Sequence, residues 1–206
     1  NLAEAEAALQ KALELNRNSL EALQTLAGLQ LARGETDKAM ASYQRYIEAN
    51  PRDARAYVLL GSLEQHRNNA ARAEELYRKA LSAQPENPMA ANNLAYLLLE
   101  QGRDIDVALS LAQIARRGMP DSPVSADTLA WAYYQKGTYR SAVDLLEGAV
   151  KTSPDNVEYN FHLGMAYGKL GDKARARTFL EKALRLDTRQ ARAGEIRKAL
   201  EDLSKG

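Results

Sequence analysis

The sequence predicts an all-α solenoid built from repeated pairs of helices, and three observations support this fold class. A proline returns every 34 or 35 residues, at Pro51, Pro85, Pro120 and Pro154. An alanine keeps the same period, at Ala39, Ala73, Ala108, Ala142 and Ala176. Strand patterns are missing, since valine and isoleucine are few and no useful length alternates apolar with polar residues. Such a period indicates units that bury their apolar faces only against neighbouring units.

The unit that begins at residue 54 shows how the pattern predicts two helices. Its first segment, 54–67, places Tyr57, Leu60 and Leu63 at a spacing compatible with one helical face. Its second segment, from about 71 to 83, carries an apolar residue at positions i, i+3, i+4, i+7 and i+8. A proline then closes the unit, because proline lacks the N–H group that a continuing helix needs.

Small residues mark the turn and the contact between the two helices of a unit. The turn position holds Gly34, Gly102, Gly137 and Gly171, with Asn68 in the equivalent place of the second unit. Glycine reaches positive φ at low cost, so we expect it to end each first helix. The periodic alanine falls early in the second helix, where a larger side chain would push the paired helices apart.

The period divides the chain into one continuous array. Full units are expected at 20–53, 54–87, 88–122, 123–156 and 157–190. Residues 1–19 correspond to the second helix of a truncated preceding unit, since Ala5, Leu9 and Ala12 stand 34 residues before Ala39, Tyr43 and Tyr46. Residues 191–206 are expected to form a C-terminal capping helix, with Ile196, Ala199, Leu200 and Leu203 on one face.

Two irregularities predict local differences between the units. The unit 88–122 carries one extra residue between Gly102 and Ala108, so its turn between helices should be longer. The unit 157–190 ends in Thr188 where the others end in proline, and we expect its second helix to run closer to the next one.

Composition narrows the possible functions. Lys and Arg number 28 against 27 Asp and Glu, so no strong field favours nucleic acid or an anionic membrane. There is no cysteine, and the two histidines, His66 and His162, have no short metal-ligand spacing around them, so no metal and no cofactor are expected. No triad or phosphate loop indicates an enzyme. No apolar run is long enough for direct membrane insertion.

The sequence does not determine the cellular compartment of the protein. We expect a soluble protein of the cytoplasm or periplasm, and the start at Asn1 without methionine favours a fragment of a longer chain.

The pattern resembles the tetratricopeptide repeat, over almost the whole chain. In the fourth unit the resemblance rests on Leu129, Ala130, Tyr133, Gly137, Tyr139, Ala142, Leu146, Ala149 and Pro154. In the fifth it rests on Leu163, Gly164, Tyr167, Gly171, Ala176, Leu180 and Ala183. The resemblance implies a right-handed superhelix of helix-turn-helix repeats that acts as a non-catalytic protein–protein interaction scaffold. The stretches 92–99 and 129–133 are also similar to repeat proteins of bacterial envelope and export systems, which favours a bacterial source.

In that family the first helices of successive repeats line a concave groove that binds ligands. The family's exposed positions, transferred to this chain, predict a peptide-binding groove in repeats three to five. Its residues are Asn92, Asn93, Tyr96, Asp127, Trp131, Tyr134, Phe161, His162 and Met165. Tyr96, Trp131 and Met165 occupy one equivalent position in successive repeats, and exposed residues of these types often anchor a partner.

The residues of this groove admit two interpretations. Their aromatic side chains either bind a peptide or fill the superhelix by packing on one another. Asn93 either pairs with a peptide backbone or, with Asn92, faces solvent. His162 is expected to form hydrogen bonds in the groove, while Asp127 and Glu158 would favour a ligand with a basic residue. The lysines and asparagines of the family's carboxylate clamp are absent, so an acidic chaperone tail is not the expected ligand.

The competing function is structural assembly. In that interpretation the open helix within 1–19 and the backs of the helices make the contacts, and the chain forms a homo-oligomer through its N-terminal helix. In both cases the expected partner is a protein or peptide.

Overall fold

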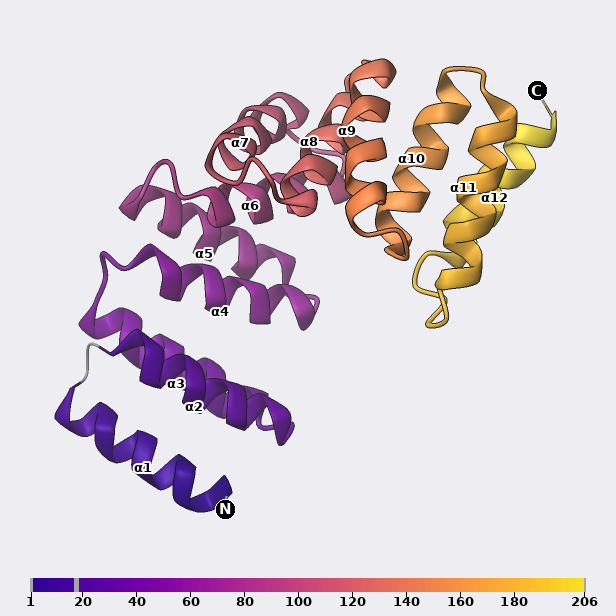
Figure 1. Cartoon of the computed structure of the whole chain (residues 1–206). Coiled ribbons are helices and arrows are strands. Elements are labelled where there is room, and N and C mark those ends of the chain that lie inside the picture. Colours follow the sequence, from indigo (N-terminus) through magenta and orange to yellow (C-terminus); the bar gives the residue numbers. More distant parts are fainter. Residues whose placement is uncertain (1, 17–18, 206) are drawn as a thin grey trace. The chain divides into compact units, whose positions relative to one another are not determined.

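The computed structural model describes residues 2–16 and 19–205, so Asn1, Arg17, Asn18 and Gly206 of the predicted terminal segments lie outside the described residues. Within the described ranges the chain forms twelve α-helices and no strand, which confirms the all-α prediction (Figure 1). The helices are α1 (Leu2–Leu15), α2 (Leu20–Ala32), α3 (Thr36–Ala49), α4 (Ala54–His66), α5 (Ala70–Ala83), α6 (Pro88–Glu100), α7 (Ile105–Gly118), α8 (Pro123–Gln135), α9 (Tyr139–Thr152), α10 (Val157–Lys169), α11 (Lys173–Leu186) and α12 (Ala193–Lys205).

The helical repeats are grouped into two compact units, each larger than a single repeat. From here on, the first unit is Asn1–Leu97 and the second unit is Leu98–Gly206. In the first unit α2 packs on α1 and α3, and α4 packs on α3 and α5. In the second unit each helix from α7 to α12 packs on the next one along the chain. Helix α10 also contacts α8 and α12, so it is the central helix of this unit.

The periodic alanines lie where helices meet, and this explains their small size. Ala39, Ala73, Ala108, Ala142 and Ala176 have no solvent-exposed surface. Each stands in the first turns of the second helix of its repeat. Helices that cross this closely leave no space for a longer side chain.

The turns between paired helices use the predicted left-handed residues. Gly137 has φ 78° after α8, and Asn68 has φ 60° after α4. Asparagine tolerates this region better than most residues, which explains why it replaces glycine there. The turn between α6 and α7 is one residue longer than the others and adds a second left-handed residue, Asp104, at φ 49°. The prediction of a longer turn is therefore confirmed.

The last helix, α12, packs on α11 and α10. The side chain of Ile196 on α12 is fully buried against Phe161 and Leu180, and Ala199, Leu200 and Leu203 pack around them. The connection before α12 differs from the prediction. Helix α11 ends at Leu186 and α12 begins at Ala193, so six residues join them where four join the other repeats. The expectation that α11 runs closer to the next helix is wrong, because Gln190 takes a left-handed φ of 53° and the chain makes an extra turn.

None of the helices in the described part of the chain is both long and apolar enough to cross a membrane.

Candidate functional site: a ring stack and an ion cluster on helices α8 and α10

Helices α8 and α10 supply all six predicted groove residues of the second unit. Pro123 occupies the first turn of α8, where its missing N–H group costs no hydrogen bond. The side chain of Asn156 caps α10 by accepting a hydrogen bond from the backbone N–H of Tyr159, at 3.0 Å. The two helices contact each other directly, which brings Asp127 on α8 beside His162 on α10.

A buried hydrogen bond joins these two side chains. The Nδ1 atom of His162 lies 2.8 Å from a carboxylate oxygen of Asp127, and both side chains are almost fully buried. Because a carboxylate can only accept, the imidazole donates from Nδ1. This bond fixes the orientation of the ring. The Nε2 atom of His162 is buried as well and has no hydrogen-bond partner among the described residues.

Trp131 is held by a stack of rings. Its ring lies 4.0 Å from that of His162 with 12° between the planes, and 4.5 Å from that of Tyr134 with 7° between the planes. The ring of Phe161 is tilted against both Trp131 and His162. The indole is still partly exposed, so it is a rigid aromatic surface rather than a core residue.

An ion cluster borders this stack. The guanidinium of Arg192 donates to both carboxylate oxygens of Glu158 and, at 2.7 Å, to Glu100 at the end of α6. Its charged group also lies 5.5 Å above the ring of Phe161. Burial of the guanidinium opposes its charge, but the hydrogen bonds to the two glutamates outweigh this and raise the pKa of Arg192 above its ordinary value.

The connection before α12 places Arg192 in this cluster. The buried carboxylate of Asp187 accepts hydrogen bonds from the backbone N–H groups of Ala191 and Arg192, at 3.0 and 2.8 Å. The additional residues of this connection thus form a closed loop that holds the backbone of Arg192.

The predicted residues of the second unit separate into two groups. Asp127, Phe161 and His162 are buried, so the expectation that they are exposed is wrong, because α8 and α10 pack on each other at these positions. Trp131, Tyr134 and Met165 are partly exposed. Asp127 and Glu158 already hold intramolecular partners, His162 and Arg192. They therefore do not support the expected preference for a basic ligand.

The other three predicted residues, Asn92, Asn93 and Tyr96, lie on α6 in the first unit. Asn92 is buried, so the expectation that it is exposed is wrong as well. Its Nδ2 atom lies 3.5 Å from the Oδ1 atom of Asn93. Asn93 donates to the hydroxyl of Ser62 at 3.4 Å, so this asparagine makes a contact between helices α6 and α4. Tyr96 is partly exposed on α6. A binding role for all nine predicted residues stays a prediction.

The members of the ion cluster are absent from the nine predicted groove residues. Glu100 and Arg192 are 92 residues apart, and no short motif joins them. The one sequence feature at this place is the loss of the periodic proline at Thr188, which marks the altered connection.

The comparisons with known proteins decide the family. A model of the tetratricopeptide repeat matches residues 1–54, 25–88 and 128–191, and a second tetratricopeptide repeat model matches 76–106. The chain belongs to the tetratricopeptide repeat family. None of the curated proteins matches it. Members of this family are typically non-catalytic scaffolds.

Solved structures of tetratricopeptide repeat proteins share the fold. YrrB, described as a TPR protein with an unusual peptide-binding site, has a TM-score of 0.66 at 21% identity, over 93% of this chain and 98% of its own. MamA (41-end) from Desulfovibrio magneticus RS-1 has a TM-score of 0.65 at 19% identity, over 83% of this chain and 96% of its own. The Cut9–Hcn1 structure gives a TM-score of 0.76 at 18% identity, over 98% of this chain and 39% of the matched chain.

Proposed function

We propose that this tetratricopeptide repeat protein binds a peptide segment of a partner protein, and that the faces of α8 and α10 in repeats four and five make the principal contacts of the predicted groove. Membership of the family supports a protein–protein interaction scaffold. The observation that carries the finer proposal is the partly exposed ring of Trp131, stacked on Tyr134 and His162. The peptide-binding site named for the similar structure YrrB gives further support.

The ring stack suits Trp131 to bind. A side chain that is already fixed loses little conformational entropy when a partner covers it. The large flat indole can bury a large area against a partner, which is typical of the residues that dominate interface energies. Met165 lies on α10 four residues after Phe161, on the same helical face, and is also partly exposed. The proposed peptide therefore contacts an aromatic surface beside a flexible apolar side chain.

The proposal is tested with a displayed library of random peptides selected on the full chain. Selected peptides are then synthesised and titrated while the emission of Trp131, the one tryptophan of the chain, is recorded. We expect saturable changes of emission. We also expect the Trp131→Ala variant, measured by calorimetry, to bind about 30-fold more weakly, which corresponds to about 2 kcal/mol.

Two variants control this experiment. Met165→Ala should weaken the same peptides without disturbing the ring stack. Val107→Ala on α7 removes a similarly apolar but exposed side chain outside the proposed face and should leave the affinity unchanged. If Trp131→Ala and Met165→Ala both bind like the natural chain, the proposed face is not the binding site.

One observation favours the alternative of assembly through α1. Among the stronger helix contacts of the described residues, α1 packs on α2, and the side chain of Leu15 is 83% exposed. An exposed apolar side chain of this size can dock against a second copy. Light scattering with Leu15→Asp tests this. Self-association that the substitution removes would support assembly, and a monomer at all concentrations would contradict it.

A further inference from the structure

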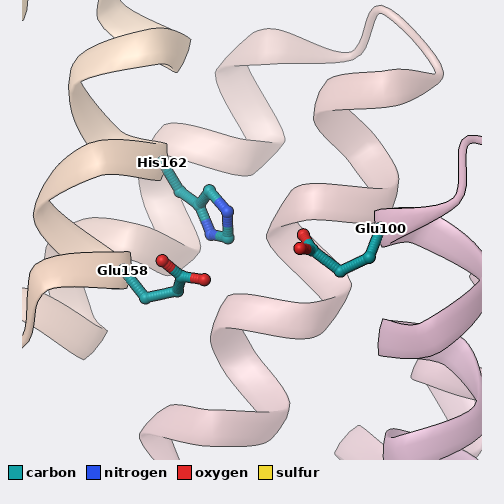
Figure 2. Close-up of side chains that lie close together, drawn as sticks. All are labelled: Glu100, Glu158 and His162. Carbon is teal, nitrogen blue, oxygen red and sulfur yellow. The ribbon is translucent and has the colours of Figure 1, made fainter. Parts of the chain in front are cut away.

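Three side chains of the second unit converge as potential metal ligands. A ring nitrogen of His162 and one carboxylate oxygen each of Glu100 and Glu158 lie within 4.8 Å of one another. Figure 2 shows the imidazole and both carboxylates turned toward one another, with His162 and Glu158 one helical turn apart on α10. Three ligands from two helices leave room for a solvent ligand, as in open metal sites.

The hydrogen bond between His162 and Asp127 prepares the imidazole for a metal. The N–H group at Nδ1 donates a hydrogen bond to Asp127. In a neutral imidazole with its hydrogen at Nδ1, the Nε2 atom carries a lone pair that can bind a metal. A buried lone pair without a donor is costly, and Nε2 of His162 has no hydrogen-bond partner among the residues that the structure describes. A carboxylate on one imidazole nitrogen and a metal on the other is a recurrent arrangement, because the carboxylate orients the ring and increases its basicity.

The charges around this point favour a further cation. Asp127, Glu100 and Glu158 contribute three carboxylates, whereas the guanidinium of Arg192 contributes one positive charge. The guanidinium donates to the two glutamates, whereas no described residue donates a hydrogen bond to Nε2 of His162. The buried lone pair of His162 is therefore the ligand atom that a cation would satisfy here.

We propose that Glu100, Glu158 and His162 form a binding site for a zinc ion, with Asp127 as the positioning residue of the imidazole and with Arg192 as the group that the ion displaces. One imidazole and two carboxylates are borderline ligands that suit Zn²⁺ better than Mg²⁺ or Ca²⁺, which prefer oxygen alone. Zinc ligands bind at about 2.0–2.2 Å, so the three atoms must close slightly around the ion. The flexible side chains of the two glutamates can provide that movement.

If zinc displaces Arg192, the zinc affinity should depend on this side chain. The guanidinium and the ion compete for the same carboxylate oxygens, so removal of the guanidinium should strengthen zinc binding. Arg192→Gln deletes the charge and keeps much of the side chain's length. We expect it to tighten the zinc affinity by about tenfold or more, the equivalent of one competing charged hydrogen bond.

Calorimetric titration of the metal-free full chain with Zn²⁺ alone tests the proposal, with elemental analysis of the bound metal. We expect one zinc ion per chain, no heat with Mg²⁺, and a change in Trp131 emission, because Trp131 stacks on the ligand ring at 4.0 Å. Glu158→Gln and His162→Gln should remove the site. Asp127→Asn should weaken it about 10–100-fold, the range found when such an orienting partner is lost.

The second histidine provides the matched control. His66 is exposed at the end of α4 in the first unit, so His66→Ala should leave the zinc affinity unchanged. Circular dichroism checks that each variant is folded. If replacement of the buried His162 unfolds the chain, Glu158→Gln still tests the site, because Glu158 is partly exposed. Absence of zinc binding to both the natural chain and Arg192→Gln overturns the proposal. Binding that Glu158→Gln leaves unchanged, or that His66→Ala removes, overturns it as well.

Discussion

Replacement of Gly164 by alanine should destabilise the second unit, although alanine is the better helix former. Gly164 lies in α10 where α11 crosses it. A Cβ atom at this position would stand 2.7 Å from Cγ and 3.0 Å from Cδ2 of Leu180, and 3.1 Å from the backbone oxygen of Ala176. The branch point of a leucine and a helix backbone cannot swing aside, so α11 must shift. Overpacking of this kind costs about 1–3 kcal/mol, while the gain in helix propensity is about 1 kcal/mol.

Gly148 in α9 provides the matched comparison, because a Cβ atom there would meet no atom of the described residues within 4 Å beyond its chain neighbours and its own helix backbone. Gly148→Ala should therefore stabilise the same unit by up to about 1 kcal/mol. The difference between the two variants removes the propensity term and leaves the overpacking cost, about 1–3 kcal/mol. Urea unfolding followed by the emission of Trp131 measures both, since this residue reports on the same unit. Equal stabilisation by both substitutions would refute the close approach of α10 and α11.

Three further changes test other parts of the structure. Burial and the nearby charge of Asp127 raise the pKa of Tyr159 from 10.0 to about 12. Its contribution to stability is therefore complete below about pH 10 and lost between about pH 10 and 12, and Tyr159→Phe should remove this decline from the pH dependence of urea unfolding. Ile196→Ala should cost about 2–5 kcal/mol, because the buried side chain fixes α12, and faster amide hydrogen exchange confined to α12 and α11 would show it. Asp53→Ala should cost about 0.5–2 kcal/mol, because the Asp53 carboxylate caps α4; an unchanged thermal midpoint would contradict that role.

The fold was predictable because the repeat period constrains the residues that make it. A buried alanine such as Ala142 must recur wherever two helices cross, and a left-handed turn residue such as Gly137 wherever they reverse. Even the exceptions were informative, since Asn68 takes the same left-handed conformation as the glycines. The longer connection before α12 was not predicted. The sequence shows the missing proline at Thr188, but the repeat period does not predict that the Asp187 carboxylate accepts hydrogen bonds from the backbone N–H groups of Ala191 and Arg192.

The site was predictable only in part, because helical periodicity gives a residue's direction and not what covers it. The period correctly gathered Asp127, Trp131 and His162 on facing helices. It did not show that contact between α8 and α10 buries the first and the last of these. The pairing of Glu100 with Arg192 was missed for a related reason. Their ion pair joins segments 92 residues apart, and no local pattern encodes such a contact.

The partner-binding role of the Trp131 face is the central functional claim, and one nuclear magnetic resonance measurement tests it most directly. The chain has a single tryptophan, so its indole N–H group gives one cross-peak. On titration with a selected peptide, we expect this cross-peak to shift progressively and to saturate at one peptide per chain. A cross-peak that stays in place while calorimetry shows the same peptide to be bound would contradict the claim.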